Sequence, residues 1–280
     1  MKKLLLLVAA AVMSFSLQGQ ISTPQPSPFS KIHQVVGLTD VTLEYSRPSM
    51  RGRTIFGDLV PFDKVWRTGA NARTKITFSD DVTIGETTLK AGTYAIFTKP
   101  GQSSWDIYFY TDTAGGGTPS NWDESKIAAQ INVPVYALAD DVQTFTMNFY
   151  NLTNNGAALG MMWEKTLVGV PFAVPTRAKA QQSIEAAMGG PSANDYFSAA
   201  LYYLQEDLDL NKAKMWIDKA VSMNDQAFWM SRQQSLIYAK MGDKAGAIKA
   251  AKKSLADAKA ANNADYVKMN MDSLKEWGAM

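Results

Sequence analysis

Hydrophobic and polar residues alternate with a period of two over much of the chain before Pro175. In 41–45 and 105–110, apolar side chains at every second position would give a strand one buried face and one wet face. The turn Asn154-Asn155-Gly156 favours a hairpin because Asn and Gly tolerate a positive φ. Many short strands separated by turns predict an antiparallel sandwich or barrel, and we expect the sandwich. The expected strands are 41–45, 76–78, 82–89 as a hairpin around Gly85, 92–98, 105–110, 144–149, 157–163 and 167–174.

The pattern changes to helical spacing after Pro175. Apolar residues there recur every three or four positions, as in 213–220, and β-branched residues become fewer. Asp209 and Asp243 are suited to cap helix N-termini, and Gly242 is suited to end a helix. The expected helices are 177–188, 195–205, 210–222, 226–241, 243–259 and 263–276.

The helical part also contains an internal repeat of about 34 residues, a period typical of tetratricopeptide repeats. The matched pairs are Asp209 with Asp243, Ala213 with Ala247, Ile217 with Ala251, and Ala220 with Ser254. Small residues at these positions would let two helices approach closely. The alternative is a generic helical bundle in which the register agrees by accident. We predict an all-β part followed by an all-α part, an antiparallel β-sandwich and then a tetratricopeptide-like helical domain.

The N-terminus has the layout of a secretory signal peptide. Lys2 and Lys3 precede an apolar run at 4–13, and most of residues 14–20 are small or polar. That run is shorter than the roughly 20 apolar residues of a membrane anchor, which is the alternative. We expect cleavage near Gly19 and export to the periplasm or the extracellular space. The expected segments are a signal peptide at 1–19, a Pro-rich linker at 20–30, a β-sandwich domain at 31–175 and a helical domain at 176–280.

The amino-acid composition excludes several kinds of catalytic and metal-binding site. The 280 residues include no Cys and one His, His33, so thiol nucleophiles, zinc–thiolate sites and histidine clusters are excluded within one chain. We therefore expect no metal and no cofactor. Loss of residues 1–19 would remove Lys2 and Lys3 and lower the net charge from +2 to 0. A neutral protein has no general attraction to nucleic acid, so we expect no nucleic-acid partner. We also expect no membrane-spanning segment, because no later apolar run is long enough.

Five ordered motifs carry a resemblance to a known family. They are YSRPSMRGRTIFG at 45–57, VWRTGANA at 65–72, ITFSDDV at 76–82, LKAGTY at 89–94 and WEKT at 163–166. Together they resemble the exported bacterial proteins grouped as domain of unknown function 2911, over roughly residues 30–175. The resemblance implies a β-sandwich-like secreted domain. It supplies no activity, substrate or catalytic residue, and we predict no catalytic residue.

Residues 47–75 hold seven Lys and Arg residues against two Asp residues. Arginine binds carboxylate, sulfate or phosphate in a two-pronged manner, and an adjacent aromatic ring can stack on a sugar. One hypothesis is therefore a pocket for a small anionic or glycan ligand. Its predicted wall is formed by Arg47, Arg51, Arg53, Trp66, Arg67 and Asn71. The alternative is structural: the arginines would pair with carboxylates such as Glu44, Asp80 or Asp81, and Trp66 would fill the core.

Other candidates are weaker. His33 stands alone, and no G-x-S-x-G nucleophile motif accompanies it. The pair Asp80-Asp81 is typical of a turn. Residues 207–211 imitate the start of a calcium loop, but Lys212 occupies the position that needs glycine. Gly115 to Gly117 lacks the Lys-Ser/Thr of a phosphate loop, so we expect a flexible connection there.

Two functional hypotheses follow. The favoured one is a non-enzymatic ligand-binding or protein-interaction module of the cell envelope, with helices that offer a groove to a protein or peptide. The alternative is an envelope hydrolase or isomerase that uses carboxylates and the arginine cluster on a glycan or anionic substrate.

Overall fold

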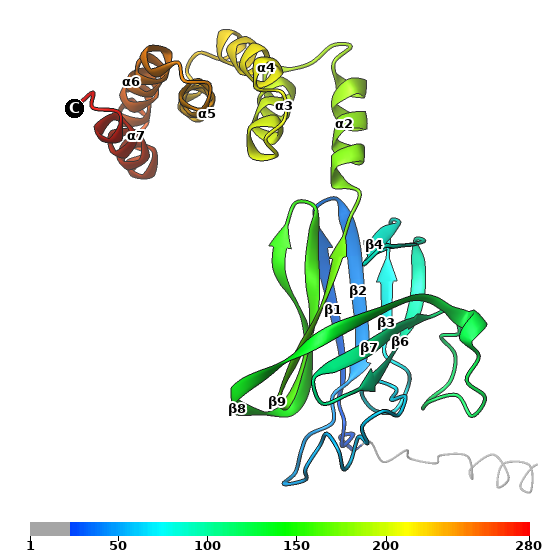
Figure 1. Ribbon diagram of the computed structural model, residues 1–280. Helices are drawn as coiled ribbons and strands as arrows, with labels where there is room; N and C mark the ends of the chain where they lie inside the picture. Colours follow the sequence, from blue (N-terminus) through cyan, green and yellow to red (C-terminus); the bar gives the residue numbers. More distant parts are fainter. Residues whose placement is uncertain (1–22) are drawn as a thin grey trace, which may run out of the picture. The chain divides into compact units, whose positions relative to one another are not determined.

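The computed structural model describes residues 23–280, so the predicted signal peptide and the first residues of the predicted linker lie outside the described residues. Two compact units divide the chain, one ending at Thr176 and one spanning 177–280. We call them the β unit and the helical unit and describe each by itself. Within residues 23–280, nine strands precede six α-helices (Figure 1). The predicted all-β plus all-α class is therefore confirmed.

The strands of the β unit pair antiparallel throughout, in the order β1-β2-β3-β6-β7-β8-β9-β4-β5. They are β1 Phe29–Val36, β2 Thr39–Ser46, β3 Lys75–Phe78, β4 Val82–Ile84, β5 Thr87–Leu89, β6 Gly92–Pro100, β7 Ser104–Tyr110, β8 Ile127–Thr153 and β9 Gly156–Ala173. A short 3₁₀ helix, η1, spans Glu124–Lys126.

The long strand β8 belongs to both layers of the sandwich. Its first part, up to Pro134, pairs with β7, and its second part, from Val135, pairs with β9. Register shifts interrupt the second pairing between Ala137 and Thr146. Bulges of this kind let a strand bend from one sheet into the next. The strand predicted at 144–149 is thus one segment of a longer strand, and those predicted at 157–163 and 167–174 are one strand, β9.

The two layers enclose a hydrophobic core to which both contribute their inward faces. In β2, Val41, Leu43 and Tyr45 are buried, as the period of two predicts. Trp105 of β7 and Trp163 of β9 are both 2% exposed and are among the largest buried side chains. The core therefore confirms the pattern on which the sandwich was predicted.

Strand β7 is also covered on its outer face. Tyr108 and Tyr110 pack there with Phe97 of β6, and Trp122 closes over them from the connection that precedes η1. The rings of Tyr110 and Trp122 are stacked, with centroids 4.7 Å apart. The connection between β7 and β8 is therefore held against the sheet.

Strand β1 was not expected from the sequence, and it begins at Phe29 inside the segment expected to be a linker. It pairs with β2 along its whole length, from Phe29 opposite Ser46 to Val36 opposite Thr39. Phe29 and Val35 stay 63% and 51% exposed. An edge strand with two half-exposed faces lacks the apolar alternation that marks a strand in sequence.

The helices of the helical unit agree with the predicted ranges to within a few residues. They are α2 Thr176–Ala187, α3 Ala193–Gln205, α4 Leu210–Met223, α5 Phe228–Lys240, α6 Lys244–Ala260 and α7 Ala264–Glu276. The Asp209 side chain accepts from the N–H groups of Asn211 and Lys212, and that of Asp243 accepts from Gly246. Both predicted N-caps are confirmed.

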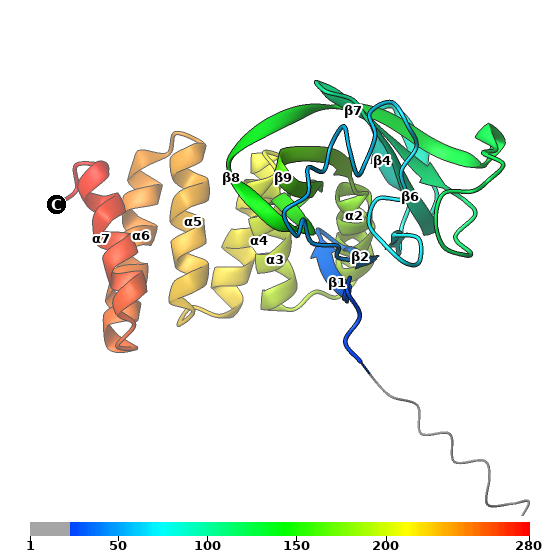
Figure 2. The same cartoon turned by 90° about the horizontal axis from the view of Figure 1, so that it is seen from below.

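Successive helices α3 to α7 pack side by side in alternating directions (Figure 2). The starts of α3 and α5, and those of α4 and α6, lie 35 and 34 residues apart, which agrees with the predicted period. The small residues of the repeat, among them Ala213, Ala220, Ala247 and Ser254, are all fully buried. The helical region is thus confirmed, and this spacing is the support for its likeness to tetratricopeptide repeats. Within residues 23–280 each helix is too short or too polar to span a bilayer.

Candidate functional site

Most of the predicted arginine pocket residues are bonded within the fold. Arg47 donates from Nε to the carbonyl of Phe145, at 3.2 Å, and from Nη2 to Thr146 Oγ1, at 2.7 Å. Arg53 donates to the carbonyls of Met50 and Ser49, at 2.9 and 2.7 Å. Arg47 therefore ties the connection after β2 to strand β8, and Arg53 satisfies backbone carbonyls of that connection itself.

Two further predicted residues tie the start of the described chain to this loop. Arg51 donates to the carbonyl of Pro26, at 3.0 Å, and the Asn71 amide donates to the carbonyl of Ser27, at 3.1 Å. Arg51 and Asn71 also have φ near +50° to +60°, as turn residues do.

The carboxylates proposed as structural partners of these arginines bind other residues instead. Glu44 pairs with Lys31, and Asp81 pairs with Lys90. Asp80 accepts from the hydroxyl groups of Thr39 and Ser79. The expected partners are therefore corrected for Arg47, Arg51 and Arg53. These arginines donate to backbone carbonyls and to the Thr146 hydroxyl group, not to Glu44, Asp80 or Asp81.

Trp66 is part of the core. Its ring stacks on that of Trp163 with centroids 6.0 Å apart, and it meets Phe145 and Trp105 edge-on at 5.2 and 6.4 Å. Its backbone exchanges two hydrogen bonds with Thr98, at 2.7 and 3.0 Å. This placement supports the interpretation of Trp66 as a residue that fills the core.

Glu164 was quoted only as part of a family motif, and the structure gives it a specific contact. Its carboxylate accepts from the backbone N–H groups of Ile55 and Phe56, at 3.3 and 3.4 Å. Its own φ is +52°, beside the register shift of β8 and β9. The sequence could not predict this role of Glu164, because the amides that its carboxylate binds lie over 100 residues away.

Arg67 and Arg73 lie at the glycine triplet. Arg67 Nη1 is 3.7 Å from the position that a Cβ on Gly117 would take, and Arg73 Nη2 is 4.0 Å from the corresponding position on Gly115. Arg73 is 8% exposed and forms an ion pair with Asp112 at 3.1 Å. The Nε atoms of both arginines are buried without a partner.

The triplet itself is more than a flexible connection, which corrects the expectation from sequence. Gly116 forms a bridge with Ala72, and a Cβ on Gly116 would lie 3.0 Å from the carbonyl oxygen of Asn71. Thr118 Oγ1 donates to the carbonyl of Val65, at 3.3 Å. The triplet is thus packed onto the segment that carries Arg67 and Arg73.

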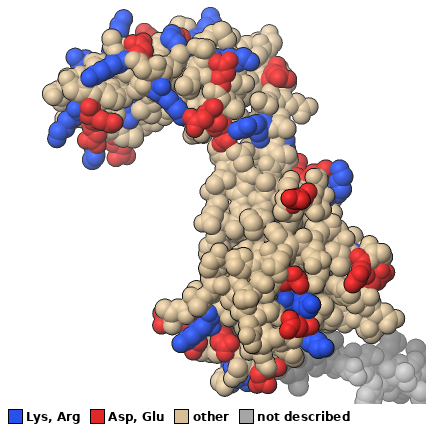
Figure 3. All heavy atoms as spheres, in the orientation of Figure 1, with Lys and Arg blue, Asp and Glu red and all other residues tan. Residues whose placement is uncertain are grey.

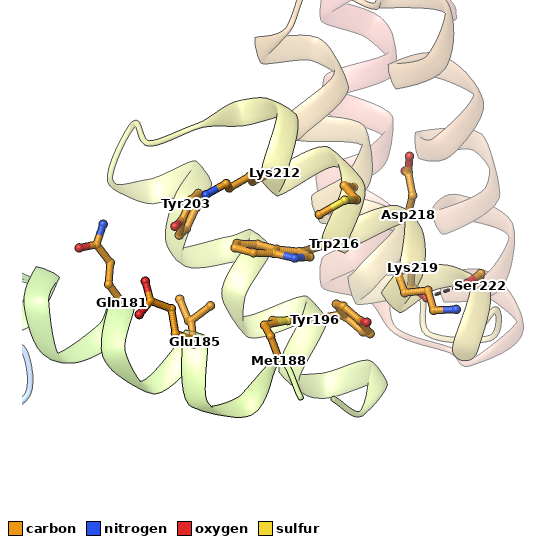
Figure 4. Close-up of a pocket in the computed structure, with 12 residues that line it drawn as sticks. Gln181, Glu185, Met188, Tyr196, Tyr203, Lys212, Trp216, Asp218, Lys219 and Ser222 are labelled. Carbon is orange, nitrogen blue, oxygen red and sulfur yellow. Dashed lines mark hydrogen bonds between the residues drawn. The ribbon is translucent and has the colours of Figure 1, made fainter. Parts of the chain in front are cut away.

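A groove of about 820 Å³ lies in the helical unit, between α2, α3 and α4. Its apolar wall contains Trp216 and Tyr203, both 8% exposed, together with Ile184 and Tyr196. Figure 4 shows Trp216 at its centre, with side chains of α2 on one side. The lining residues are Gln181, Ile184, Glu185, Met188, Tyr196, Tyr203, Lys212, Met215, Trp216, Asp218, Lys219 and Ser222. We call this feature the α2–α4 groove.

Charged residues frame the α2–α4 groove. Lys212 and Lys219 are two turns apart on one face of α4 and have no ion pair within the described residues. Asp218, by contrast, accepts from Lys214, Gln234 and Tyr238, at 2.7, 2.8 and 2.6 Å. Burial raises the pKa of Asp218, but these hydrogen bonds outweigh burial and lower it overall.

Metal binding gains no support from the side chains. Among residues 23–280, no three His, Asp or Glu side chains gather closely enough to hold a metal ion. Asp207 forms an ion pair with Lys240, and Asp209 caps α4, so the calcium-like stretch is a helix–helix connection. His33 bonds Asp40 at the exposed edge of β1 and β2, at 2.9 Å.

Comparison with known proteins identifies the β unit. Residues 27–172, about half of the chain, match the family model described as a protein of unknown function (DUF2911). The chain belongs to the DUF2911 family. This confirms the resemblance found in the motifs, and the family description assigns no activity.

Two further comparisons add little. None of the curated proteins compared with the chain matches it. A solution structure of a protein from Bordetella parapertussis matches with 20% identity, covers 35% of this chain and 85% of its own, and has a TM-score of 0.32. A TM-score of this size does not establish a shared fold.

Proposed function

We propose that this DUF2911 protein is an exported, non-enzymatic binding protein whose helical unit holds an extended segment of a partner protein in the α2–α4 groove. The groove itself carries the proposal. A cavity of about 820 Å³ with an aromatic wall and a few polar groups is the usual form of a binding site.

The chemistry of the groove defines the partner segment. Trp216, Tyr203 and Ile184 offer an apolar surface that suits an aliphatic or aromatic side chain. Lys212 and Lys219 lie at the rim without acidic partners among the described residues, so they suit carboxylates on the partner. We therefore propose a segment with an apolar anchor flanked by acidic residues.

The face of the molecule drawn in Figure 3 shows no large basic patch that would suggest a different partner. Figure 3 shows Lys and Arg mixed with Asp and Glu over the helical unit, whereas most of the visible face of the β unit is uncharged. Nucleic-acid binding needs a continuous basic stripe. The mixed pattern favours protein recognition instead.

Export is the second part of the proposal, and the sequence of residues 1–19 supports it. Expression with the native N-terminus in a Gram-negative host, followed by cell fractionation and mass spectrometry, tests it. We expect a mature protein that begins near Gln20 outside the cytoplasm. A full-length protein retained in the cytoplasm would contradict export.

The groove can be tested without a known partner. Panning a random peptide library on the purified mature protein should select peptides with an apolar anchor and acidic flanks. Met215→Glu, at a 58% exposed lining residue, should weaken the selected peptides about tenfold or more. Met269→Glu is the control, because Met269 is also an exposed methionine, at 40%, but lies on α7 and does not line the groove. Equal binding by both variants, or no selected peptide, would contradict the proposal.

The hydrolase alternative requires a carboxylic acid that stays protonated near neutral pH. The pKa of several described carboxyl groups is shifted the other way, below its ordinary value. Hydrogen bonds from Lys90, Ala114, Ser125 and Ser192 lower the pKa of Asp81, Asp112, Asp123 and Asp195, respectively. These four carboxyl groups therefore do not supply such an acid.

A further inference from the structure

The Arg67 side chain lacks an acceptor. It is half-buried, its Nε is buried without a partner, and within the described residues its guanidinium has no hydrogen bond or ion pair. A guanidinium carries five N–H donors and cannot lose its charge. Such a group is costly to bury in part without an acceptor, so a fold retains it at a cost in stability.

The neighbouring Arg73 adds positive charge that is only partly balanced. Its Nη1 donates to the carbonyl of Asp112, at 2.8 Å, and also pairs with the Asp112 carboxylate. Lys126 shares the same carboxylate, at 3.4 Å. One Asp therefore serves two cations, while Arg73 Nε remains buried without a partner.

The outer glycines of the triplet lie beside these charges. Gly115 and Gly117 have φ of +87° and +75° and carry no side chain, and one arginine lies next to each of them. Gly116 anchors the triplet to Ala72 between them. Both guanidinium groups thus lie at the same short, packed loop.

We propose that Arg67, with Arg73 as a supporting charge, binds a small oxyanion at the Gly115–Gly117 loop. The oxyanion is a sulfate, a phosphate or the carboxylate of a sugar acid, because these groups accept two parallel N–H bonds from a guanidinium. This site lies in the β unit and is independent of the α2–α4 groove.

The four arginines predicted to line a pocket differ in whether the protein itself supplies an acceptor. Arg47, Arg51 and Arg53 already donate to oxygens of the protein. Among the four predicted arginines, only Arg67 has no acceptor within the described residues, which leaves its two Nη groups for an external one. Arg73, which was not among the predicted pocket residues, is the arginine that lies with Arg67 at the glycine triplet.

The experiment titrates the mature full-length protein with sodium sulfate, sodium phosphate and sodium glucuronate at constant ionic strength, with glucose as the neutral probe. Isothermal titration calorimetry and thermal melting are the readouts. We expect at least one anion to bind with a Kd of about 1 mM or below and to raise the melting temperature, with no response to glucose. The anion that binds best distinguishes a free inorganic ion from a sugar acid.

Variants then locate the binding. Arg67→Gln should weaken the anion about tenfold or more, whereas Arg51→Gln, in the same basic segment, should bind like the wild type. Without anion, Arg67→Met should melt at or above the wild-type temperature, because it removes a charge that has no partner. A structural arginine would instead lower it. Should Arg67→Gln fail to fold, Arg67→Lys should keep the charge and still bind several-fold more weakly, because it loses the two-pronged geometry.

Binding of none of the three anions at about 10 mM would overturn the proposal. Unchanged affinity in Arg67→Gln, or in Arg67→Lys where only that variant folds, would also overturn it.

Discussion

At the scale of single residues, the β unit depends on a few side chains that supply partners to an irregular backbone. The connection between β2 and β3 is held by Arg47, by Glu164 and by the core ring of Trp66. Tyr45 does the same for β8: its hydroxyl group donates to the Met147 carbonyl, at 3.0 Å, and accepts from the Met147 N–H, at 2.9 Å. The hydrogen bonds of Arg47, Glu164 and Tyr45 satisfy backbone groups that the sheet leaves open.

The Tyr45 contact leads to a first prediction. Tyr45→Phe should lower the free energy of unfolding of the β unit by about 1–3 kcal/mol, because both polar groups of Met147 lose their partner in the core. Urea denaturation followed by tryptophan fluorescence measures it. Tyr136→Phe, at a 57% exposed tyrosine, should change it by less than about 0.5 kcal/mol. Equal effects of the two variants would contradict the role given to Tyr45.

At the scale of elements, tight turns join parts of the β unit that are distant in sequence. The β1–β2 turn contains Gly37, with φ of +58°, packed against Thr176 and the carbonyl of Asn154 in the β8–β9 turn. The Leu38 N–H also donates to Thr176 Oγ1, at 3.3 Å. The first hairpin is thereby fastened to the last one.

The packing of Gly37 can be separated from its backbone conformation. Gly85 has the same φ of +58° in the β4–β5 turn, but its nearest neighbour, Ile131, would lie 3.6 Å from a Cβ. Gly85→Ala should therefore cost only the strain of a positive φ, about 1–2 kcal/mol. Gly37→Ala should cost about 1–3 kcal/mol more, because the turns must move apart. Thermal or urea unfolding of both variants checks this, and equal losses would exclude the packing argument.

In the helical unit, Asp218 connects the helix pair α3–α4 to the helix pair α5–α6. It lies on α4 and accepts from Gln234 and Tyr238 of α5 as well as from Lys214 on its own helix. Because the pKa of Asp218 is lowered in the folded state, its contribution to stability is present above the ordinary pKa of about 3.8 and is lost as the pH falls through the lowered value.

Asp218→Asn should therefore destabilise the helical unit at pH 7 by about 1–2 kcal/mol, and the difference from wild type should shrink towards pH 3. The control is Asp272→Asn, because Asp272 forms the same i,i+4 pair with Lys268 at 2.6 Å but is exposed and lacks the other bonds. That variant should change stability by less than about 0.5 kcal/mol. Urea melts monitored by circular dichroism at both pH values decide between these outcomes.

At the scale of the whole molecule, two separate cores stabilise one chain. The β core consists of large apolar and aromatic residues, whereas the helical core includes many alanines, such as Ala199, Ala213 and Ala220. The two clusters share no residue. Each unit therefore has the core that independent stability requires.

Independent cores predict independent responses to core mutation. Ile217→Ala removes a fully buried side chain of α4 and should cost the helical unit about 2–5 kcal/mol. Circular dichroism at 222 nm should then show an earlier loss of helix, while the unfolding midpoint of the β unit, followed by its β-sheet signal, stays at its wild-type value. A simultaneous shift of both transitions would show that the units unfold together.

The sequence by itself determined the two periodicities, the helix ends and the repeat. Apolar spacing and capping residues such as Asp209 and Asp243 act over a few positions, so a linear sequence contains all the information they need. The family motifs were likewise visible as ordered runs of residues. The identity of the arginines was also visible, but the identity of their acceptors was not.

Only the tertiary structure decided which of these side chains have partners. The acceptors of Arg47 lie in β8 and the amides bound by Glu164 lie before β3, about 100 residues away in each case. Backbone carbonyls and amides are the same at every residue, so residue identity cannot mark them. The long bend of β8, the edge strand β1 and the unpaired Arg67 emerge for the same reason: each depends on which distant segment the folded chain brings alongside.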